Sequence, residues 1–401
     1  MSGSRRRVIV AGAGVAGLET TLALRALAGE LLSVEVVAPE QEFTYRPLAV
    51  AVPFGGGDVQ RAPLEELVRA AGAVYRNGAL AAVDTERRIA MLEVGDELSY
   101  DALVVALGAR ASEGIPGALT FRGPEDAQDV VALLADAEAG RLERIGFALP
   151  AAATWPLPLY ELALLTATYL HEHGTNEVEV EVVLVTPEPR PLAVFGPAAS
   201  DATTKLLDMG GVRIATAAVP QKWEKGILHL AGGGEIPTDR VVALPRLEGR
   251  PIGGLPQDEA GFVATDGLGQ VEGLSDVYAA GDLTELWIKQ GGIAAQQADA
   301  VASAIAARAG AEVEPAPFSP VLRGLLLTGS APRFLRGEKG TSLVNAHPLW
   351  WPPAKIVGRY LSPFLAEHLG LVTEPDEAPP ADAVPVEIAL ETRDRATWAS
   401  I

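Results

Sequence analysis

The stretch that decides the fold reads RVIVAGAGVAGLETTLALRALAG and spans residues 7–29. Its first part, Arg7–Ala11, is a short β-branched run, which predicts a strand. Leu18–Ala28 is rich in Ala and Leu, which favour a helix, and Gly29 ends it. Val34–Val37 predicts the next strand. Strands that alternate with helices in this way predict an α/β fold with a parallel sheet covered on both faces.

The turn between the first strand and the helix has the pattern Gly12-x-Gly14-x-x-Gly17. Gly12 permits a tight turn, Gly14 lets the backbone approach a pyrophosphate, and Gly17 lets the helix pack closely on the strand. Val15 and Ala16 belong to this candidate site, and the N-terminus of the helix that follows offers amide donors and partial positive charge to an anion. The pattern therefore predicts a dinucleotide site. The alternative is a glycine turn that binds nothing, and the matching strand and helix disfavour it.

An acidic residue that binds the ribose is expected at the end of the second strand, about twenty residues beyond the glycines. That place holds Ala38, and the nearest carboxylate belongs to Glu40. Either Glu40 reaches the ribose from two residues later, or backbone groups and water hold the ribose. A solvated surface role for Glu40 stays an equal alternative.

Composition excludes several classes of protein. A chain of 401 residues exceeds the usual limit of one core, which predicts two or three domains. The net charge of −20 disfavours nucleic acids and anionic lipids as partners. The chain contains no cysteine, so disulfides, thiolate metal sites and thiol relays are excluded. The sequence contains no uninterrupted run of about 18 apolar residues, so we expect no membrane-spanning helix. We also expect no N-terminal signal segment.

A second unit repeats the alternation of strands and helices. It comprises expected strands at 145–149, 178–185 and 212–216 and expected helices at 159–170 and 201–209. Two similar modules in tandem indicate two dinucleotide-type folds, one of which has lost its ligand in one interpretation. Proline-rich residues 312–320 predict a linker. Strand-like and aromatic runs follow it, and then an acidic, proline-bearing tail.

Three distal motifs add to the glycine turn. Ala106-Leu107-Gly108 ends a buried-strand run, Val277–Asp282 is a strand with an acid at its carboxyl end, and Lys289-Gln290-Gly291-Gly292 follows. Together with the segment Phe43–Leu48, these motifs resemble the flavoprotein family of pyridine nucleotide-disulfide oxidoreductases. The branch that they are most similar to contains sulfide:quinone and type II NADH:quinone reductases. The resemblance spans roughly residues 6 to 310.

The resemblance implies two Rossmann-like domains of the glutathione-reductase type with a small C-terminal domain. The implied boundaries are 1–112 with 240–315 for the FAD domain, 113–239 for a second domain with a degenerate nucleotide motif, 316–370 for a C-terminal cap and 371–401 for the tail. The implied cofactor is FAD.

The resemblance also implies roles for particular residues. Gly281-Asp282 places a carboxylate on the ribityl chain of FAD. The helix that begins near Gln290–Ile293 points its N-terminus at the flavin pyrimidine edge, where it stabilises negative charge on reduction. Lys289 lies near the flavin or at the surface. Residues around the cofactor are implied to include Arg46, Pro47, Ala106 and Gly108.

Two departures from the family matter. Without cysteine, neither a disulfide-reducing pair nor a sulfur-carrying thiol can operate. The nicotinamide module normally has its own glycine turn, but here that place reads LPAAATWPLP over residues 149–158. Proline lacks an N–H, and Cβ atoms crowd a pyrophosphate, so this turn disfavours NAD(P)H. The turn is similar to that of quinone reductases that take no NAD.

These observations predict an FAD-dependent oxidoreductase that passes electrons from an unidentified small-molecule donor to an acceptor, for which a quinone or a protein are the candidates. An NAD(P)H-dependent flavin oxidoreductase and a non-catalytic flavin-binding sensor or partner protein are the alternatives. No metal site is expected, because His171 and His173 lie on different helix faces.

The segment around Trp350 and Trp351 has two interpretations. It forms an apolar quinone pocket or a peripheral membrane contact, or it packs between domains or in a homodimer. We expect a cytoplasmic protein with at most peripheral contact with the inner face of the membrane.

Overall fold

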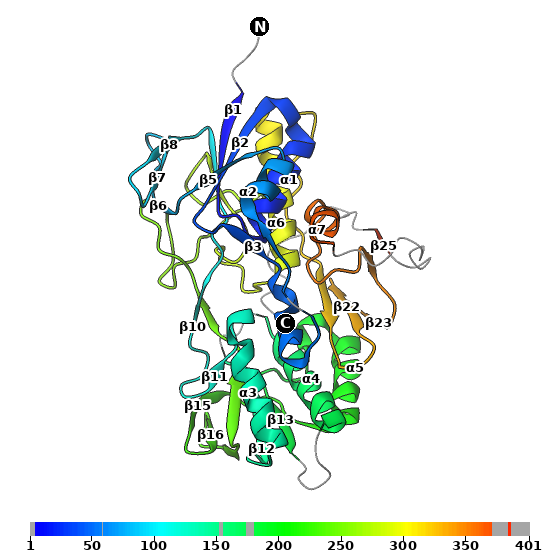
Figure 1. The fold of residues 1–401 in the computed structure, drawn as a ribbon. Helices are drawn as coiled ribbons and strands as arrows, with labels where there is room; N and C mark the ends of the chain where they lie inside the picture. The colour runs from blue at the N-terminus through cyan, green and yellow to red at the C-terminus, as the bar shows by residue number, and fades with distance from the viewer. Residues whose placement is uncertain (1–4, 58, 152–154, 174–179, 371–383, 386–401) are drawn as a thin grey trace.

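The computed structural model describes residues 5–57, 59–151, 155–173, 180–370 and 384–385. Two five-stranded parallel sheets form the centres of two modules, one above the other in Figure 1. The first sheet has the order β20-β9-β1-β2-β5. Its strands are β1 (Arg6–Ala11), β2 (Leu32–Ala38), β5 (Val74–Asn77), β9 (Ala102–Val105) and β20 (Val277–Ala279). The prediction of a parallel α/β fold is confirmed.

Two long helices, α1 (Val15–Ala28) and α6 (Gly291–Ala309), lie side by side on the first sheet (Figure 1). Their contact is made close by small residues, since most of α6 is Ala, Gly, Ser or Val and is buried. The helix α1 begins three residues before the expected start at Leu18, because Gly14 already adopts the extended conformation of an N-cap. A shorter helix, α2 (Leu64–Ala70), completes this module.

The second sheet has the order β11-β18-β12-β13-β14, again parallel throughout. Its strands are β11 (Leu119–Thr120), β12 (Arg144–Ala148), β13 (Glu181–Val185), β14 (Val212–Ala215) and β18 (Arg240–Ala243). Its helices are α3 (Ala127–Glu138), α4 (Leu157–His173) and α5 (Pro197–Met209). The expected repeat of strands and helices is therefore confirmed. Residues 178–179, where a strand start was expected, lie outside the described residues.

Small antiparallel sheets decorate both modules. A three-stranded meander interrupts each, formed by β6 (Leu80–Asp84), β7 (Ile89–Leu92) and β8 (Glu97–Ser99) in the first and by β15 (Pro220–Glu224), β16 (Ile227–Leu230) and β17 (Glu235–Pro237) in the second. Two further pairs are β3 (Glu42–Thr44) with β4 (Arg61–Pro63), and β10 (Arg110–Ser112) with β19 (Arg246–Glu248). Single 3₁₀ segments are η1 (Gly29–Leu31), η2 (Arg46–Phe54), η3 (Pro124–Asp126) and η4 (Ala193–Phe195).

The strands at the start of the C-terminal region lie against the second module, and its helix lies against α1 of the first (Figure 1). It comprises β21 (Leu322–Leu326), β22 (Arg333–Glu338), β23 (Thr341–Asn345), β24 (Trp350–Trp351), α7 (Leu361–Leu369) and β25 (Val384–Pro385). Residues 312–320 contain neither helix nor strand, as expected of a linker. The side chains of Leu322, Leu326 and Leu335 are buried in the core of the second module. The division into domains stays a proposal, which this strand order supports.

The packing interpretation of Trp350 agrees with its surroundings. The side chain is 1% exposed and meets the ring of Phe334 edge-on with 5.0 Å between ring centres. Its indole N–H donates to the carbonyl oxygen of Ala354 at 3.0 Å. The acidic tail over 371–401 lies outside the described residues except for the backbone of β25. None of the described helices is long and apolar enough to cross a membrane.

Candidate functional site

The sheet topology brings the distal motifs to one edge. Ala11 of β1 lies opposite Val105 of β9, and Val105 lies opposite Ala279 of β20. Since these strands are parallel, the residues that follow them meet at the carboxyl edge of the sheet. In open α/β sheets this edge is where ligands bind. The turns that begin at Gly12, Ala106 and Gly281 therefore form one constellation.

Close backbone packing requires glycine at two positions of the first turn. Gly12 has φ +105°, and a Cβ atom there would lie 2.2 Å from the carbonyl oxygen of Ala106. A Cβ atom at Gly17 would lie 1.9 Å from the carbonyl oxygen of Gly12. Both distances are far below contact, so any side chain would force the turn, β9 and α1 apart. The glycines thus fix the approach of three elements.

Gly14 differs, because a Cβ atom built on it meets nothing within 4 Å. It is the N-cap of α1, no side chain caps the helix, and the first turn carries no acidic residue. The first N–H groups of a helix have no partner within the helix. Uncapped N–H groups beside an empty cradle, at the positive end of a helix, suit a diphosphate group.

Gly281 touches the glycine turn directly. With φ +80°, its Cβ position lies 3.0 Å from Cβ of Ala16 and 3.5 Å from Cβ of Ala294. Its N–H donates to Oε1 of Gln297 at 2.8 Å. The loop that carries Asp282 is thereby held against the start of α1.

The carboxylate of Asp282 is half-buried and accepts no hydrogen bond from any described residue. Burial raises the pKa of this carboxyl group, and the charge of Lys289 opposes that rise. Buried acceptors are normally satisfied. The half-buried carboxylate of Asp282 therefore keeps its capacity to accept a hydrogen bond, in the loop that lies against the start of α1.

The N-terminus of α6 lies next to that of α1, since the Cβ position of Gly291 is 3.7 Å from Cγ2 of Val15. Gln290 is the N-cap of α6, and its side-chain oxygen accepts from the N–H of Ile293 at 2.8 Å. The N–H of Ile293 is thus already paired within the protein. The N–H groups of Gly291 and Gly292 are the ones left to face a ligand.

Other expected site residues have different surroundings. Glu40 is exposed at the carboxyl end of β2, where its backbone oxygen accepts from the hydroxyl of Tyr75 at 2.6 Å. Arg46 begins η2, is exposed, and pairs with Glu125 at 3.8 Å. Pro47 follows it in the same turn, and Gly108 has φ +66° with open space at its Cβ position.

Two contacts at the site were not expected from the sequence. The hydroxyl of Tyr45 is buried and accepts from the N–H of Ile356 at 3.0 Å, and burial raises its pKa to about 12. Ile356 in turn touches the Cβ position of Gly291 at 3.3 Å. Beside it, Nζ of Lys355 bonds both carboxylate oxygens of Glu161 at 2.6 and 2.7 Å. The C-terminal region is thus fixed over the start of α6.

A pair of buried carboxyl groups, those of Glu19 and Asp299, joins α1 to α6. Glu19 accepts from the N–H groups of Tyr360 and Leu361 at 2.9 and 2.6 Å, which fastens the start of α7. Asp299 is its buried neighbour, and no described donor reaches either oxygen of Asp299. Burial and the charge of Glu19 raise the pKa of Asp299. Two adjacent buried carboxyls disfavour the state in which both are ionised.

At the corresponding edge of the second module, a carboxylate is already hydrogen-bonded within the protein. The half-buried carboxylate of Glu188, which follows β13, accepts from the hydroxyls of Tyr160 and Thr186 at 2.6 and 3.0 Å and from the N–H of Ala193 at 3.2 Å. The ring of Trp155 packs edge-on against Phe195 with 5.5 Å between centres. Residues 152–154 of the intervening turn lie outside the described residues. The carboxylate of Glu188 thus accepts three hydrogen bonds within the protein, whereas that of Asp282 accepts none from the described residues.

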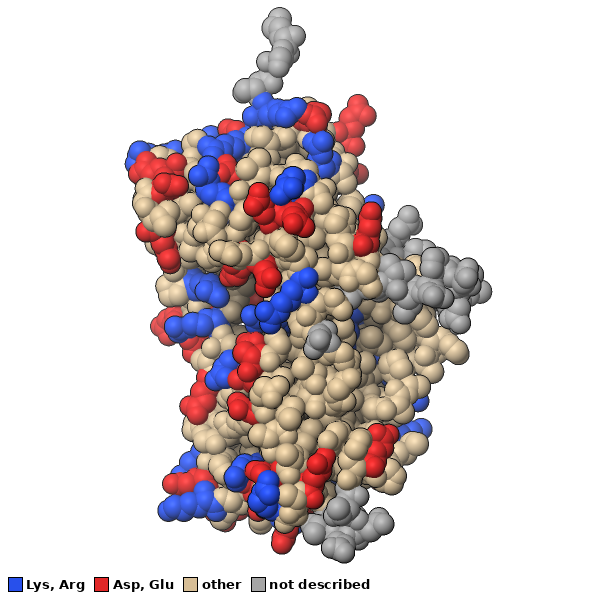
Figure 2. Space-filling view, in the orientation of Figure 1, with Lys and Arg blue, Asp and Glu red and all other residues tan. Residues whose placement is uncertain are grey.

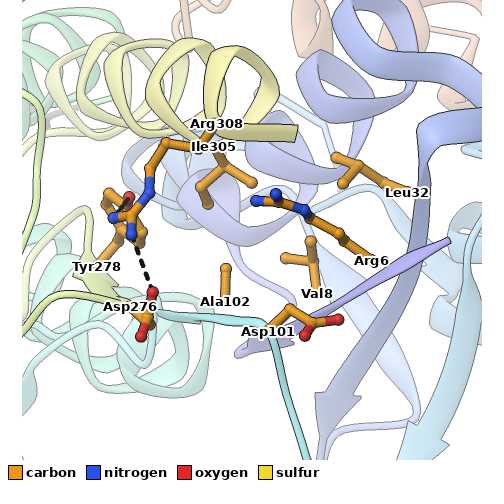
Figure 3. A pocket seen from close by; sticks show the side chains of 9 residues that line it. All are labelled: Arg6, Val8, Leu32, Asp101, Ala102, Asp276, Tyr278, Ile305 and Arg308. Atoms are coloured by element: carbon orange, nitrogen blue, oxygen red, sulfur yellow. Dashed lines mark hydrogen bonds and ion pairs between the residues drawn. The ribbon is translucent and has the colours of Figure 1, made fainter. Parts of the chain in front are cut away.

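Two hollows complete the description. An open one of about 560 Å³ lies beyond β13 and β14 and contains Arg190, Lys205 and Asp201. An enclosed one of about 30 Å³, drawn in Figure 3, lies at the amino ends of β1, β9 and β20. There Arg308 bonds Asp276 at 3.0 Å. This cavity holds about one water molecule and lies at the edge of the sheet opposite to the glycine turn.

Comparisons with known proteins agree with this site. The family model described as pyridine nucleotide-disulphide oxidoreductase matches residues 6–298. The chain therefore belongs to the pyridine nucleotide-disulphide oxidoreductase family, a family of flavin-dependent enzymes, and is an oxidoreductase. The interpretation as a non-catalytic protein is set aside. No curated protein matches the sequence.

Solved structures share the fold at low sequence identity. The sulfide:quinone oxidoreductase of the hyperthermophilic bacterium Aquifex aeolicus has a TM-score of 0.76 at 18% identity, over 85% of this chain and 87% of that one. NDH2 of Plasmodium falciparum in complex with NADH has a TM-score of 0.66 at 13% identity, over 85% and 92%. A ferredoxin reductase of Rhodopseudomonas palustris has a TM-score of 0.60 at 21% identity, over 83% and 82%.

Proposed function

We propose that this protein is an FAD-dependent oxidoreductase that takes electrons from a donor other than a thiol and passes them to a quinone. The observation that carries the proposal is the contact of Gly281 with Ala16, 3.0 Å from a Cβ position to Cβ. This contact sets a carboxylate without a donor beside the uncapped start of α1. Such a pair of groups suits the two halves of one flavin dinucleotide.

In this proposal different residues bind different parts of the cofactor. The start of α1 around Gly14 holds the diphosphate, Glu40 lies at the carboxyl end of β2 where the ribose belongs, and Asp282 accepts from a ribityl hydroxyl. The N–H groups of Gly291 and Gly292 face the flavin pyrimidine edge, where the positive end of α6 stabilises negative charge. Bound FAD would supply the two-electron chemistry, and the chain would supply position and electrostatics.

The choice of donor rests on two observations. The chain has no cysteine, and groups at the second crevice are already engaged within the protein. There is no cysteine in the sequence, so no thiol or disulfide carries electrons. Glu188 and Trp155 are engaged within the protein, which disfavours a nicotinamide dinucleotide in the second crevice. A quinone as acceptor is supported by the similar structure of a sulfide:quinone oxidoreductase, whose name describes that protein alone.

One observation favours a second candidate, an NAD(P)H-dependent flavin oxidoreductase. The open hollow of about 560 Å³ beyond β13 and β14 has the size of a ligand site and contains the cationic groups of Arg190 and Lys205. Arg190 is already paired with Asp201. The Arg190–Asp201 pair repels an incoming phosphate less than the carboxylate of Glu188 would. The alternative is therefore a nicotinamide dinucleotide that binds from this side.

The experiment begins with the purified chain and its absorption spectrum. We expect a yellow protein whose released cofactor is FAD by chromatography and mass. A colourless protein that takes up no added FAD would refute the proposal. Anaerobic addition of NADH or NADPH should leave the flavin band unchanged over minutes, whereas rapid bleaching would favour the second candidate. After photoreduction, a soluble quinone analogue should restore the band faster than it is restored in its absence.

A further inference from the structure

Two arginine side chains lie opposite each other on one face of the C-terminal sheet. Arg323 of β21 pairs in register with Arg336 of β22. Residues directly opposite each other in an antiparallel pair point to the same face, and like charges there repel. Arg323 is 5% exposed, and the side chain of Arg336 is 21% exposed. The register therefore places two cationic groups next to each other, one of them buried.

The alternation of the strands shows which way these side chains point. The opposite face of β21 packs on the second module, where the Cβ position of Gly324 lies 2.6 Å from Cζ of Phe195. Because successive residues of a strand point to opposite faces, Arg323 points away from that module. On the Arg323 face, Phe334 of β22 packs in one apolar cluster with Val357. Arg323 thus points to the side of the sheet on which Val357 lies.

The carboxylates around the two arginines do not balance their charge. An oxygen of Glu338 bonds Nη2 of Arg336 at 2.7 Å. The guanidinium group of Arg323 has five N–H donors, and no described residue offers any of them an acceptor. Burial and the charge of Arg336 lower the pKa of Arg323 to about 10, so the group stays charged at neutral pH. Among the described residues, two cations thus share one carboxylate, and burying a charge without a partner is costly.

The strand that carries Arg323 is fastened to the start of α6. The carbonyl oxygen of Arg323 accepts from Nε2 of Gln290, the N-cap of α6, at 3.2 Å. The carbonyl oxygen of Val357 lies 3.4 Å from the Cβ position of Gly292 in the first turn of that helix. In the proposed function the N–H groups of Gly291 and Gly292 face the flavin. A ligand bound to Arg323 would therefore lie close to the cofactor.

We propose that Arg323 and Arg336 form an anion site beside the flavin, which binds the carboxylate or another oxyanion group of a small electron donor. The inference rests on the proposed function and names the class of its donor. A guanidinium group binds such an anion through two parallel hydrogen bonds. The quinone proposed as acceptor is neutral, so the anionic substrate is the donor. Once bound, the anion supplies the acceptor that the described part of the chain does not provide for Arg323.

The test measures melting temperatures of the full chain in acetate, in phosphate and in chloride at equal ionic strength. A ligand that binds only the native state stabilises it, so acetate or phosphate should raise the Tm of the wild type above its value in chloride. The more effective anion tells a carboxylate site from an inorganic oxyanion site. R323M should melt at or above the wild type in chloride, because Met leaves no unpaired charge inside, and should lose the response to both anions. R141M removes an exposed Arg and is the matched control, which should respond as the wild type does.

The absorption spectrum of the FAD-loaded protein tests where the anion binds. The effective anion should shift the flavin band of the wild type and of R141M, and leave that of R323M unchanged. A response of R323M equal to that of R141M, a wild type indifferent to both anions, or a rise in Tm without a shift of the flavin band would overturn the inference. So would an R323M protein that melts well below the wild type in chloride, because the fold itself would then engage Arg323.

A second variant keeps the test decisive if R323M does not fold by far-ultraviolet circular dichroism. R323K keeps a charge but loses the planar fork, so the concentration dependence of Tm should give roughly tenfold weaker anion binding, the loss of one hydrogen bond. Wild-type affinity in R323K would then overturn the inference. A chain that binds no FAD refutes the proposed function, whereas the melting temperatures still show whether Arg323 binds an anion.

Discussion

Replacing Lys355 by Met should destabilise the protein strongly, because it leaves the buried carboxylate of Glu161 without its counter-charge. The side chains of Lys355 and Glu161 are 7% and 1% exposed, and both carboxylate oxygens bond Nζ. Removing one partner of a buried ion pair costs about 3–5 kcal/mol. With about 2.1 cal/mol/K of unfolding entropy per residue, a 401-residue chain should lose about 4–6 °C in Tm.

The pH dependence of this loss has a definite sign. Burial raises the pKa of Glu161, while Lys355 opposes the rise. Without the Lys, the folded-state pKa rises further, so the native protein binds a proton that the unfolded chain has released. Stability of K355M should therefore fall as pH rises through that folded-state pKa, and its deficit against wild type should be larger at pH 8 than at pH 5.

Urea titration followed by circular dichroism measures these differences. E161Q/K355M should recover most of the loss, because Gln is uncharged and keeps an acceptor for the N–H of Leu327, now 2.9 Å from Oε1 of Glu161. K222M breaks an exposed pair with Glu224, which water already screens, and should leave the urea midpoint close to that of wild type. A K355M protein as stable as K222M, or a double variant no better than the single one, would refute the reasoning.

Three further outcomes are expected. D299N should stabilise the protein by about 1–3 kcal/mol at pH 8 and by less at pH 5. The reason is that the pKa of Asp299 is raised in the folded protein, whereas the amide that replaces its carboxyl group needs no proton. A difference in urea midpoint that does not vary with pH would contradict this. G14L should fold with a melting temperature near that of wild type yet bind FAD at least tenfold more weakly in fluorescence titration, whereas G17A should melt far lower, because its Cβ would lie 1.9 Å from a carbonyl oxygen. Y160F should cost about 1–3 kcal/mol in urea titration, the loss of the donor to Glu188, and an unchanged midpoint would contradict the bond.

Local patterns predicted the parts of the fold that depend on local chemistry. The β-branched run before Gly12 and the Ala-rich run after Gly17 indicated β1 and α1, and the structure contains both. The motifs at Ala106 and Asp282 were connected with the turn by the resemblance to the flavoprotein family, and the carboxyl edge of the parallel sheet is the physical reason why they meet. The helix α4 begins at Leu157, two residues before its expected start, because Pro158 is tolerated in a first turn.

The contacts that the sequence did not predict join segments far apart in the chain. Lys355 and Glu161 are 194 residues apart, and Tyr45 meets Ile356 across 311. Neither pair has a spacing that a helix or strand period makes visible. Glu19 was a sign of such a distant contact, because a carboxylate within the buried stretch of α1 needs hydrogen-bond donors. The sequence does not say that α7 would supply two N–H groups.

The two modules share one fold but differ in which polar groups the protein satisfies by itself. At the second crevice Glu188 accepts three hydrogen bonds from the chain, so it gains less from a ligand hydroxyl. At the first crevice Asp282 accepts none from the described residues, and the cradle at Gly14 is empty of side chains. A ligand gains most where it satisfies groups that the fold leaves unsatisfied, because their desolvation is already paid. The topology is common to both modules, so this difference in hydrogen bonding supports the proposal that the cofactor binds to the first.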